Sequence, residues 1–477
     1  MKFSIKLLSL LLTLALLFSL LVGCNNSTPT ETPSADDTAT EAPDDTEQTP
    51  EPEPEVFEGI NLDGVPLSQY VIVYPARGTI YEKYAAENLS ASIWGAYGIE
   101  IAIHNDRTEE AEHEILIGNT NREESAIEHE PLADGEFILC QNGSKILCLG
   151  DTYMVGGGAG ELLSLLPATV EDVNITLPTE PTPKLFTVKE AKSAILMIGD
   201  GMGFNTIDMA YPRFTETFAA ALLPIQGEIR TASMTTLSNS STPTDSAASG
   251  TALATGYKTS NGRIGMDKDA QSLKNLRELA FESGAKTGVL TTDAITGATP
   301  AAFLAHTSDR NNTDIIQQQI NRLKRSSAVD VVEGSIGDTL TDVVGDALYK
   351  LCAEDSSFFL MVEEGYIDKN SHNKKMTECI NVVKRFHDSI AYVIEFVLCH
   401  PDTVLIVTAD HETGAIRKNA DGSFSYTSGD HSTSNVPIFA IGDGTEIFNA
   451  KASDNTEIPK FLAKIFSDDA FGDKQVY

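Results

Sequence analysis

The stretch Ala194-Ile-Leu-Met-Ile-Gly-Asp200-Gly-Met-Gly203 decides the fold, because an apolar run of strand length ends directly in an acid and a glycine turn. Further β-branched runs alternate with helical stretches along the rest of the chain: Lys286 to Thr291, Phe358 to Val362, Thr403 to Val407 and Pro437 to Ala440. This alternation predicts an α/β fold with a mainly parallel sheet and helices on both of its faces.

Three of these predicted strands finish in or close to acids, namely Asp200, Glu363 and Asp410. In a parallel α/β sheet, ligands bind in the crevice at the carboxyl ends of the strands. We therefore expect the three carboxylates to converge on one site. Asp410 and His411 directly follow a buried strand, where two ionisable side chains are costly unless they are ligated.

A serine opens an Ala-rich helical stretch in Thr244-Asp245-Ser246-Ala247-Ala248-Ser249-Gly250-Thr251-Ala252. The hydroxyl of Ser246 would lie at the positive end of the helix dipole, where phosphate oxygens also bind. This position favours a nucleophile, although a serine there is more often only a helix N-cap.

Two histidine positions add donors that suit a metal. Asp368 and His372 are four residues apart and share one face of a predicted helix, a spacing suited to one zinc ion. Taken alone, a solvent-exposed acid and histidine are the alternative. His431 lies in the sequence Ser-Gly-Asp-His-Ser-Thr, which by itself indicates a histidine in a surface loop.

The N-terminus carries a predicted leader. Lys2 and Lys6 precede an apolar run from Leu7 to Val22, which is too short to span a bilayer as a helix and closes in Leu21-Val22-Gly23-Cys24. This segment resembles a bacterial lipoprotein signal, and a plain secretory signal is the alternative. We expect a lipid on Cys24 to tether the protein to the outer face of a membrane, at the cell surface.

Residues 25–58 consist mostly of Thr, Pro, Glu, Asp and Ser and contain no Lys or Arg, a composition that cannot bury enough apolar surface to fold. We expect a disordered acidic tether. The formal net charge of −35 comes partly from this segment, but acids exceed bases throughout the chain. Nucleic acids and anionic membrane surfaces are therefore poor partners, and we identify no nucleic-acid-binding module.

With 477 residues, 41% of them hydrophobic, the chain should contain two folded parts. The predicted organisation is a leader (1–24), a tether (25–58), a small α/β accessory domain (59–185) and a main α/β domain (190–477). The accessory domain has predicted strands, helices and a hairpin over Tyr70 to Tyr74, Thr79 to Tyr97, Ile99 to His104, Glu114 to Ile117, Glu136 to Leu149 and Gly158 to Leu166. It faintly resembles the α/β domain that precedes catalytic barrels in some glycoside hydrolases. Its role, as a packing or spacer module or as a glycopolymer-binding module, stays open.

The predicted hairpin contains Cys140 and Cys148. A turn at Asn142-Gly143 would pair Cys140 with Lys145 and Cys148 with Phe137. The two thiols would then lie about three rungs apart, roughly 10 Å, which is beyond bridging distance. We therefore expect no disulfide there.

From Ala194 to its end, about three-fifths of its length, the chain resembles the alkaline phosphatase family. The motifs that carry the resemblance follow the family's order: Gly199-Asp200-Gly201-Met202-Gly203, Asp245-Ser246-Ala247, Ala298-Thr299-Pro300-Ala301-Ala302, Arg310, Val362-Glu363, Ile367-Asp368-Lys369 with His372, Thr408-Ala409-Asp410-His411, and His431. The resemblance implies a three-layer α/β/α sandwich that acts as the catalytic domain.

The resemblance also implies two zinc ions and one magnesium ion. The first zinc ion would be held by Asp368, His372 and His431. The second zinc ion, with Ser246 close by, would be held by Asp200, Asp410 and His411. The magnesium ion would be held by oxygen ligands only, as a hard cation prefers, from Asp200, Thr299 and Glu363. The implied roles beside the metals are a two-pronged grip on phosphate by Arg310 and contact with phosphate through water by Lys369.

Two departures from the family pattern matter. The family generally carries Asp or His two residues before the magnesium-binding threonine, and this chain has Gly297 there. The missing side chain leaves the occupancy and identity of the third metal open. The spacing from His411 to His431 is too short for the large surface insertion that some relatives use at a dimer interface, so a homodimer is not assured.

The reaction that the resemblance implies is hydrolysis of small phosphomonoesters, with a phosphoserine intermediate on Ser246 and release of inorganic phosphate. Phosphodiester hydrolysis is the alternative within the same superfamily, but Arg310 occupies room that a second ester group would need. An inactive surface binding lipoprotein is a further alternative, and the presence of every expected ligand argues against it.

Overall fold

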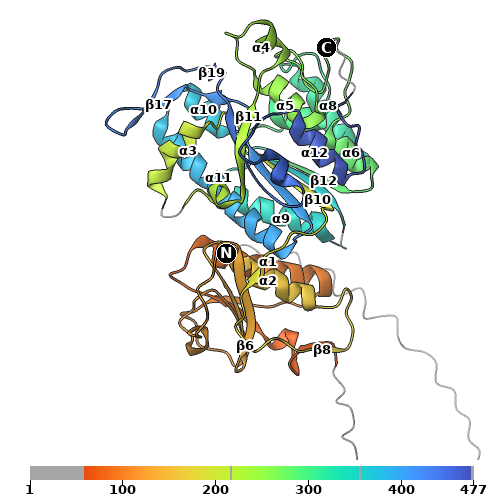
Figure 1. The fold of residues 1–477 in the computed structure, drawn as a ribbon. Coiled ribbons are helices and arrows are strands. Elements are labelled where there is room, and N and C mark those ends of the chain that lie inside the picture. Colours follow the sequence, from red (N-terminus) through yellow and green to blue (C-terminus); the bar gives the residue numbers. More distant parts are fainter. Residues whose placement is uncertain (1–57, 215–216, 354–355, 474–477) are drawn as a thin grey trace, which may run out of the picture. The chain divides into compact units, whose positions relative to one another are not determined.

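The computed structural model describes residues 58–214, 217–353 and 356–473 (Figure 1). Residues 1–57, which include the predicted leader and nearly all of the predicted tether, lie outside the described residues. Within the described ranges, none of the helices combines the length and the apolar character needed to cross a bilayer.

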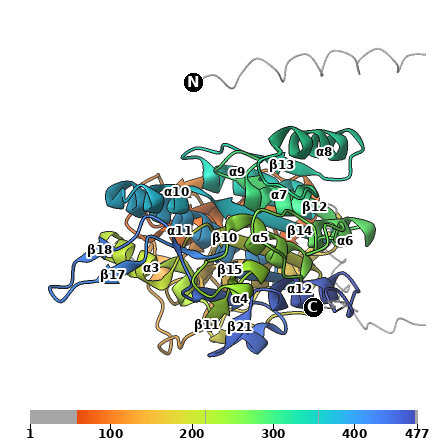
Figure 2. The same cartoon turned by 90° about the horizontal axis from the view of Figure 1, so that it is seen from above.

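An eight-stranded sheet forms the centre of the larger part of the fold (Figure 2). In spatial order its strands are β13 (Val331–Glu333), β12 (Lys286–Thr291), β14 (Phe358–Glu364), β10 (Ser193–Gly199), β15 (Thr403–Thr408), β20 (Val436–Ile441), β11 (Ile225–Arg230) and β21 (Ala452–Asp454). The first five are mutually parallel. Every residue of β10, β14 and β15 is buried, as their apolar runs predict. The predicted α/β fold with a mainly parallel sheet is confirmed.

One predicted strand runs against the others. The run from Pro437 to Ala440 lies in β20, which pairs antiparallel with both β15 and β11. A fully buried apolar strand has the same pattern in either direction, so the sequence gives no sign of its orientation. The pattern also misses the edge region of β11 and β21, because β11 alternates buried and exposed residues and contains Gly227.

Helices cover both faces of this sheet (Figures 1 and 2). One group of mutually contacting helices comprises α5 (Ser246–Thr255), α6 (Leu276–Glu282), α7 (Ala298–Leu304), α8 (Thr313–Arg325) and α12 (Glu457–Ile465). The other group comprises α3 (Phe204–Ala210), α9 (Leu340–Cys352), α10 (Tyr366–His372) and the long α11 (Met376–Cys399). A short helix, α4 (Met234–Ser238), precedes α5.

A smaller, six-stranded sheet lies N-terminal to these elements. In spatial order its strands are β4 (Ile103–Asn105), β3 (Val71–Tyr74), β5 (Glu114–Ile117), β7 (Lys145–Gly150), β6 (Glu136–Asn142) and β9 (Lys184–Leu185). It is accompanied by α1 (Ile80–Tyr97) and α2 (Val155–Leu165), and by a separate three-stranded sheet of β1 (Ile60–Leu62), β2 (Val65–Pro66) and β8 (Val173–Ile175). Each of the two larger sheets falls inside one of the predicted domains, whose boundaries stay a prediction.

The register of the hairpin differs from the predicted one. Asn142 pairs with Lys145, so the two turn residues are Gly143 and Ser144. Gly143 has φ +62°, as the first turn residue of a type II′ hairpin requires. Cys140 therefore pairs with Leu147 instead of Lys145, and Cys148 pairs with Leu139 instead of Phe137. The expectation of no disulfide is confirmed, because all five cysteines in the described ranges are free.

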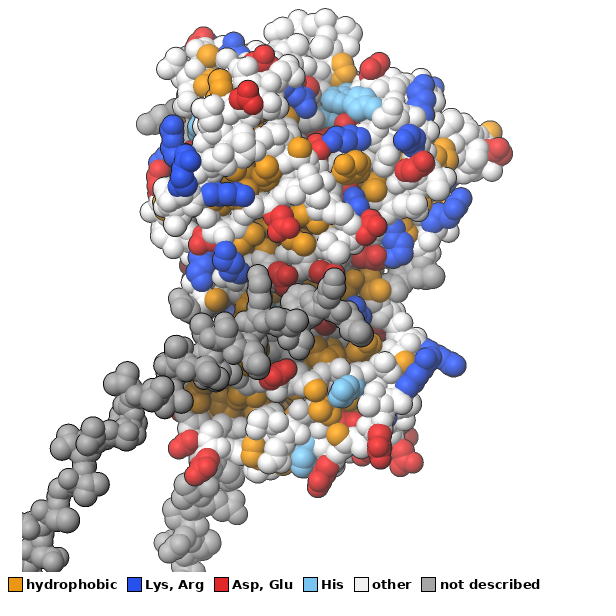
Figure 3. Space-filling model, turned by 180° about the vertical axis from the view of Figure 1, so that it is seen from behind, with side chains coloured by type: hydrophobic (Ala, Val, Ile, Leu, Met, Phe, Trp, Pro, Cys, Tyr) orange, Lys and Arg blue, Asp and Glu red, His pale blue; other side chains and the backbone are white. Residues whose placement is uncertain are grey.

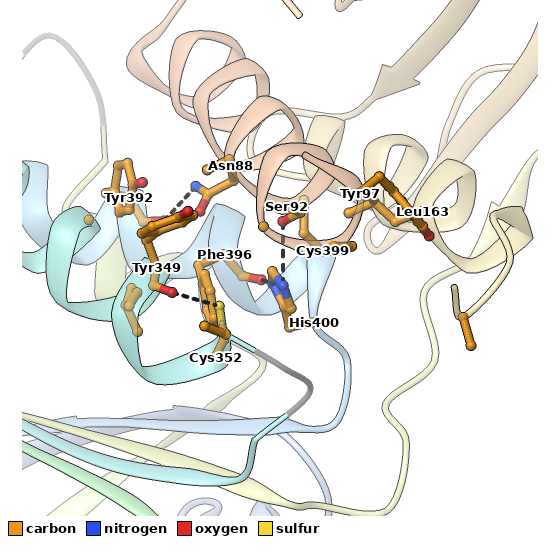
Figure 4. Close-up of a pocket in the computed structure, with 17 residues that line it drawn as sticks. Asn88, Ser92, Tyr97, Leu163, Tyr349, Cys352, Tyr392, Phe396, Cys399 and His400 are labelled. Atoms are coloured by element: carbon orange, nitrogen blue, oxygen red, sulfur yellow. Dashed lines mark hydrogen bonds between the residues drawn. The ribbon is translucent and has the colours of Figure 1, made fainter. Parts of the chain in front are cut away.

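The two larger sheets are joined through helices. Both α1 and α2 pack against α11, and Asn88 Nδ2 donates a hydrogen bond of 3.3 Å to the backbone oxygen of Tyr392. A cavity of about 570 Å³ lies between α1, α9 and α11 (Figure 4). Ser92 Oγ and His400 Nε2 are 3.4 Å apart in its wall. None of the predicted site residues lines this cavity.

Candidate metal centre

The predicted acids meet at the carboxyl ends of three neighbouring strands. Asp200 follows β10, Glu363 is the penultimate residue of β14, and Asp410 follows β15. Because β14, β10 and β15 are adjacent and parallel, their ends present these carboxylates at one edge of the sheet. All three side chains are buried, with 8% or less of each residue exposed.

The first expected donor set is compact. His372 Nε2 lies 3.3 Å from Asp368 Oδ1, and both are on α10, one turn apart. His431 Nε2 lies 3.5 Å from the same oxygen and 3.1 Å from His372 Nε2. Two ligands of one tetrahedral zinc ion, each bonded at about 2.0–2.1 Å, lie roughly 3.3–3.4 Å apart. The three donor atoms therefore have the spacing of a single zinc site.

His431 reaches this set through a small antiparallel pairing. Strand β16 (Glu412–Thr413) pairs with β19 (His431–Ser432), and Thr413 is the direct partner of His431. The chain leaves the sheet after β15, makes an excursion and returns beside the site. This pairing, not a local motif, turns an unremarkable loop histidine into a neighbour of Asp368.

The second expected donor set surrounds the serine. His411 Nε2 lies 3.6 Å from Asp200 Oδ1 and 3.2 Å from Asp410 Oδ2. Ser246 Oγ lies 3.1 Å from the same nitrogen. Ser246 is the first residue of α5, whose N-cap is Asp245, so its hydroxyl is at the positive end of the helix. Asp200 follows β10, and Asp410 and His411 follow β15, so Ser246 is the member of this set that comes from a helix.

Several buried oxygens at the site have no hydrogen-bond partner among the described residues: Asp200 Oδ1, Asp410 Oδ2 and Thr299 Oγ1. Unpaired buried oxygens are costly, and a cation satisfies them. Two groups of acids and histidines here, Asp368 with His411 and His431, and Asp200 with Asp410 and His411, could each hold a metal ion. The residues present therefore fit a metal centre.

The pKa values of the acids and of His411 also favour a bound metal ion at this site. Burial, and then the charges of Asp410 and Asp368, raise the pKa of Asp200 well above its ordinary value. Burial also raises the pKa of Asp410 to about 6. By contrast, burial holds the pKa of His411 well below its ordinary value, which keeps the ring neutral and able to ligate. Crowded acids beside a neutral imidazole favour a bound cation.

The oxygen-only set is also brought together. Thr299 lies in the first turn of α7, which packs on α5. Burial raises the pKa of Glu363 to about 8, against the opposing effect of the hydroxyls of Thr291 and Thr299. The charge of Glu363 in turn raises the pKa of Asp200. Glu363 thus lies close enough to interact with both Thr299 and Asp200.

Arg310 lies in the segment between α7 and α8. Its side chain is held by Asp245, the residue directly before Ser246. Its Nη1 donates a hydrogen bond of 3.2 Å to Asp245 Oδ2. Asp245 also accepts hydrogen bonds from the backbone N–H groups of Ala248 and Gly262, so the carboxylate is fixed. The guanidinium is thereby tied to the N-cap of the helix that carries Ser246.

Two further residues, Thr413 and Asp293, contact the predicted site residues and are not among those predicted from the sequence. The hydroxyl of Thr413 donates a hydrogen bond of 2.5 Å to Asp368 Oδ1 and orients that carboxylate. Asp293, two residues after β12, forms an ion pair with Lys369. An acid soon after a parallel strand is a signal that the sequence contains at Asp293, as it does at Asp200.

The centre is open to solvent on one side. The side chain of His372 is 37% exposed, whereas that of His411 is fully buried. Figure 3 shows histidine side chains beside basic and acidic side chains at the surface of the larger part of the fold. The first donor set is therefore accessible from solvent through His372.

Metal-ligating sets around a serine hydroxyl are what a metal-dependent phosphoester hydrolase requires, and the comparisons with known proteins agree with that class. The family model for alkaline phosphatase matches residues 191–343 and 321–423. The chain belongs to the alkaline phosphatase family and is an enzyme, a metal-binding phosphatase.

Similar proteins come from several bacteria. Alkaline phosphatase 4 of Bacillus subtilis is 28% identical over 58% of this chain and 71% of its own length. Alkaline phosphatase H of Pseudomonas aeruginosa is 41% identical over 28% of this chain and 29% of its own length. The solved alkaline phosphatase of the Antarctic bacterium TAB5 is 27% identical and superimposes with a TM-score of 0.53, covering 58% of this chain and 99% of that one.

A solved variant of the TAB5 enzyme, with a histidine replaced by glutamate, is described with Mg bound in its M3 site. It is 27% identical to this chain and has a TM-score of 0.52, covering 59% of this chain and 99% of that one.

Proposed function

We propose that this phosphatase hydrolyses small phosphomonoesters through a phosphoserine intermediate on Ser246. One observation carries the proposal: Ser246 Oγ lies 3.1 Å from His411 Nε2, inside the second donor set and at the start of α5. The hydroxyl is therefore next to the metal-ligating atoms and at the positive end of a helix, where a phosphate group binds.

We assign two zinc ions to the sets that contain histidine and one magnesium ion to Asp200, Thr299 and Glu363. Nitrogen donors suit zinc, and an all-oxygen set suits magnesium. When bound, these ions lower the pKa of the serine hydroxyl and neutralise charge on the phosphate.

The chain's own groups perform two displacements. Ser246 Oγ forms a bond to phosphorus as the bond to the leaving oxygen breaks, while the hydroxyl proton passes to solvent and the leaving oxygen takes up a proton. Water then attacks the phosphorus of phosphoserine, which releases phosphate and restores the hydroxyl. Arg310, fixed by Asp245, donates paired hydrogen bonds to phosphate oxygens in both steps.

The steady-state kcat/KM for an aryl phosphomonoester, compared with that of the matching diester, tests the substrate class. The full-length protein supplied with zinc and magnesium should prefer the monoester. Arg310→Ala should lower kcat/KM for the monoester far more than for the diester, because a diester has one phosphate oxygen fewer to bind the guanidinium. A preference for the diester in the wild type would replace the proposal by diester hydrolysis.

Ser246→Ala tests the intermediate. The substitution removes the nucleophile and leaves the donor sets in place, so kcat should fall by roughly 100-fold or more while the metal content stays unchanged. Intact-mass analysis of the wild type quenched at acidic pH should show one phosphoryl group on the peptide that contains Ser246. Ser238→Ala, at an exposed position on α4, is the matched control and should behave as wild type. A phosphoryl group on another residue would contradict the assignment.

We also propose that the enzyme is anchored at the outer face of a membrane by a lipid on Cys24. The support is the Leu21-Val22-Gly23-Cys24 sequence after a short apolar run. Cys24→Ser should move the activity from the membrane fraction to the soluble fraction without changing kcat. Recovery of the wild type in the soluble fraction alone would contradict the anchor.

A further inference from the structure

Position 297 lacks a side chain beside the third metal site, but the space that such a side chain would enter is occupied. A Cβ atom on Gly297 would lie 3.1 Å from Asp293 Oδ2 and 2.9 Å from the backbone oxygen of Ala294. The backbone of Gly297 has φ −56°, a value that any residue adopts, so its conformation does not require glycine. A side chain at this position would therefore meet both the backbone carbonyl of Ala294, at the shorter distance, and the carboxylate of Asp293.

We propose that Asp293 is a positioning residue that supplies the negative charge missing at Gly297, retains the magnesium ion at the third site and fixes Lys369. The proposal rests on the proposed function, because it assigns a role toward the ion at Asp200, Thr299 and Glu363. Asp293 lies four residues before Gly297, in the segment between β12 and α7, whereas Thr299 lies in α7 itself.

The placement of Asp293 is well defined. Its backbone N–H donates a hydrogen bond of 2.9 Å to Thr291 Oγ1, in the last residue of β12. Its Oδ1 accepts a hydrogen bond of 2.6 Å from the backbone N–H of Ala294. The same oxygen forms an ion pair with Lys369 Nζ. With Oδ1 engaged in this way, Oδ2 is the oxygen that faces Gly297.

Asp293 also lies beside a metal-ligating acid. A Cβ atom on Gly365 would lie 2.9 Å from Asp293 Cβ and 3.6 Å from Glu363 Oε2, so the two side chains flank the same glycine. Thr291 joins them, because its hydroxyl donates to Glu363 and accepts from the N–H of Asp293. Groups that hydrogen-bond or neighbour the direct ligands tune the affinity of a metal site.

The partner of Asp293 connects the third site to the first donor set. Lys369 follows Asp368 on α10, and its ammonium group, although 45% of the side chain is exposed, is directed to Asp293. Loss of the carboxylate would free this cation beside the crowded acids of the site. Asp293 therefore acts on the third ion directly through its charge and on the substrate side through Lys369.

Magnesium affinity is the readout. Full-length protein is stripped of metals and reloaded with zinc, and magnesium binding is measured by calorimetry and by elemental analysis. Asp293→Asn should weaken magnesium binding by roughly 10- to 100-fold and leave the zinc content unchanged. The matched control is Asp388→Asn on α11, because Asp388 forms a comparable ion pair with Lys384 and its side chain is 28% exposed, against 21% for Asp293.

A second pair of variants separates the proposed role from a general structural effect. In the Asp293→Ala background, Gly297→Asp should restore part of the magnesium affinity, because its carboxylate enters the space that Asp293 leaves. The close contact with the Ala294 carbonyl is present in both backgrounds, so the difference between the backgrounds isolates the effect of Asp293. In the wild-type background, the same Gly297→Asp change should weaken binding or leave it unchanged, since two carboxylates would then compete for one space.

The outcomes are distinct. Unchanged magnesium affinity in Asp293→Asn, or an equal effect of Gly297→Asp in both backgrounds, overturns the inference. A wild type that binds no magnesium overturns the inference together with the third-site assignment. Weakened magnesium binding in Asp293→Asn, in a protein that prefers diesters, supports the inference and overturns only the proposed substrate class.

Discussion

Glu395 is a buried acid that the metal centre does not use. It lies on α11 with none of its surface exposed, and its carboxylate faces α2: a Cβ atom on Gly156 would lie 2.2 Å from Glu395 Oε2. Burial, and then the charge of Glu82, raise the pKa of Glu395 well above its ordinary value of 4.5. This environment favours the protonated, neutral form of the Glu395 carboxyl group.

The raised pKa predicts how stability depends on pH. A carboxyl group whose pKa rises on folding gives its full stabilisation below the unfolded pKa of 4.5, and that stabilisation is lost as the pH rises toward the folded pKa. Glu395→Gln removes this loss, so its Tm should exceed that of the wild type at pH 8 and match it near pH 4.5. Glu378→Gln, an exposed change in the first turn of the same helix, should raise Tm at neither pH, because it only removes a favourable interaction with the helix dipole. An equal Tm for Glu395→Gln and the wild type at pH 8 would contradict the prediction.

At the scale of single elements, α2 is an unusual helix because it contains Gly156, Gly157, Gly158 and Gly160. Glycine in a helix interior usually costs about 1 kcal/mol relative to alanine. Here the glycines allow close packing, since a Cβ atom on Gly160 would lie 2.2 Å from the backbone oxygen of Leu398 in α11. Backbone atoms cannot move aside as a flexible side chain can.

Gly160→Ala should therefore destabilise the protein by about 1–3 kcal/mol, the usual cost of overpacking, despite its better helix propensity. Gly95→Ala, in α1, is the control: its Cβ atom would meet only the ring of Tyr349 at 3.5 Å, an ordinary contact. That change should raise stability by up to about 1 kcal/mol. Denaturant unfolding of both variants measures the difference, and a stabilised Gly160→Ala variant would show that the helices can separate.

The elements differ in how much of them the sequence predicts. The bounds of β5 and β12 match the predicted runs, because their apolar residues are bounded by clear polar or turn signals. The register of the β6–β7 hairpin could not be predicted from Asn142-Gly143, since both that pair and Gly143-Ser144 contain the glycine that a tight turn needs. The direction of β20 depends on its neighbours and has no local signal.

At the scale of the whole molecule, the metal centre should contribute to stability as well as to chemistry. Burial first, and then the charges of neighbouring acids, raise the pKa values of Asp200, Glu363 and Asp410 at the ends of β10, β14 and β15, so their ionised forms are costly without a cation. Bound cations offset this cost, and any ion that binds only the folded state stabilises it.

Removal of metals by a chelator should lower Tm and abolish activity, and zinc should restore both. The effect on Tm should be smaller in His372→Ala, which lacks one donor of the first set. Thermal scans of stripped and reloaded protein check this. A Tm and a turnover rate that do not change on verified metal removal would contradict a metal centre at these residues.

The predicted site residues come together because most of them are tied to predictable elements. Asp200, Glu363 and Asp410 follow from the rule for parallel strands, and the Asp368/His372 pair follows from helical periodicity. The position of His431 depends on the β16–β19 pairing across a long excursion, which only the family resemblance anticipates. Asp293 has the same signal as Asp200, an acid soon after a parallel strand, and the role that we propose for it depends on the side chain that Gly297 lacks.

The long helix α11 separates the first donor set from the helices of the smaller sheet. Its first turns contact α10, which carries Asp368, whereas Glu395 and Leu398, near its other end, contact α2 of the smaller sheet. The helix has 24 residues and spans about 36 Å. Over such a distance, changes in the N-terminal part have little leverage on the geometry of the donor sets. We therefore expect substitutions where α2 packs on α11 to leave the spacing of the donor atoms unchanged.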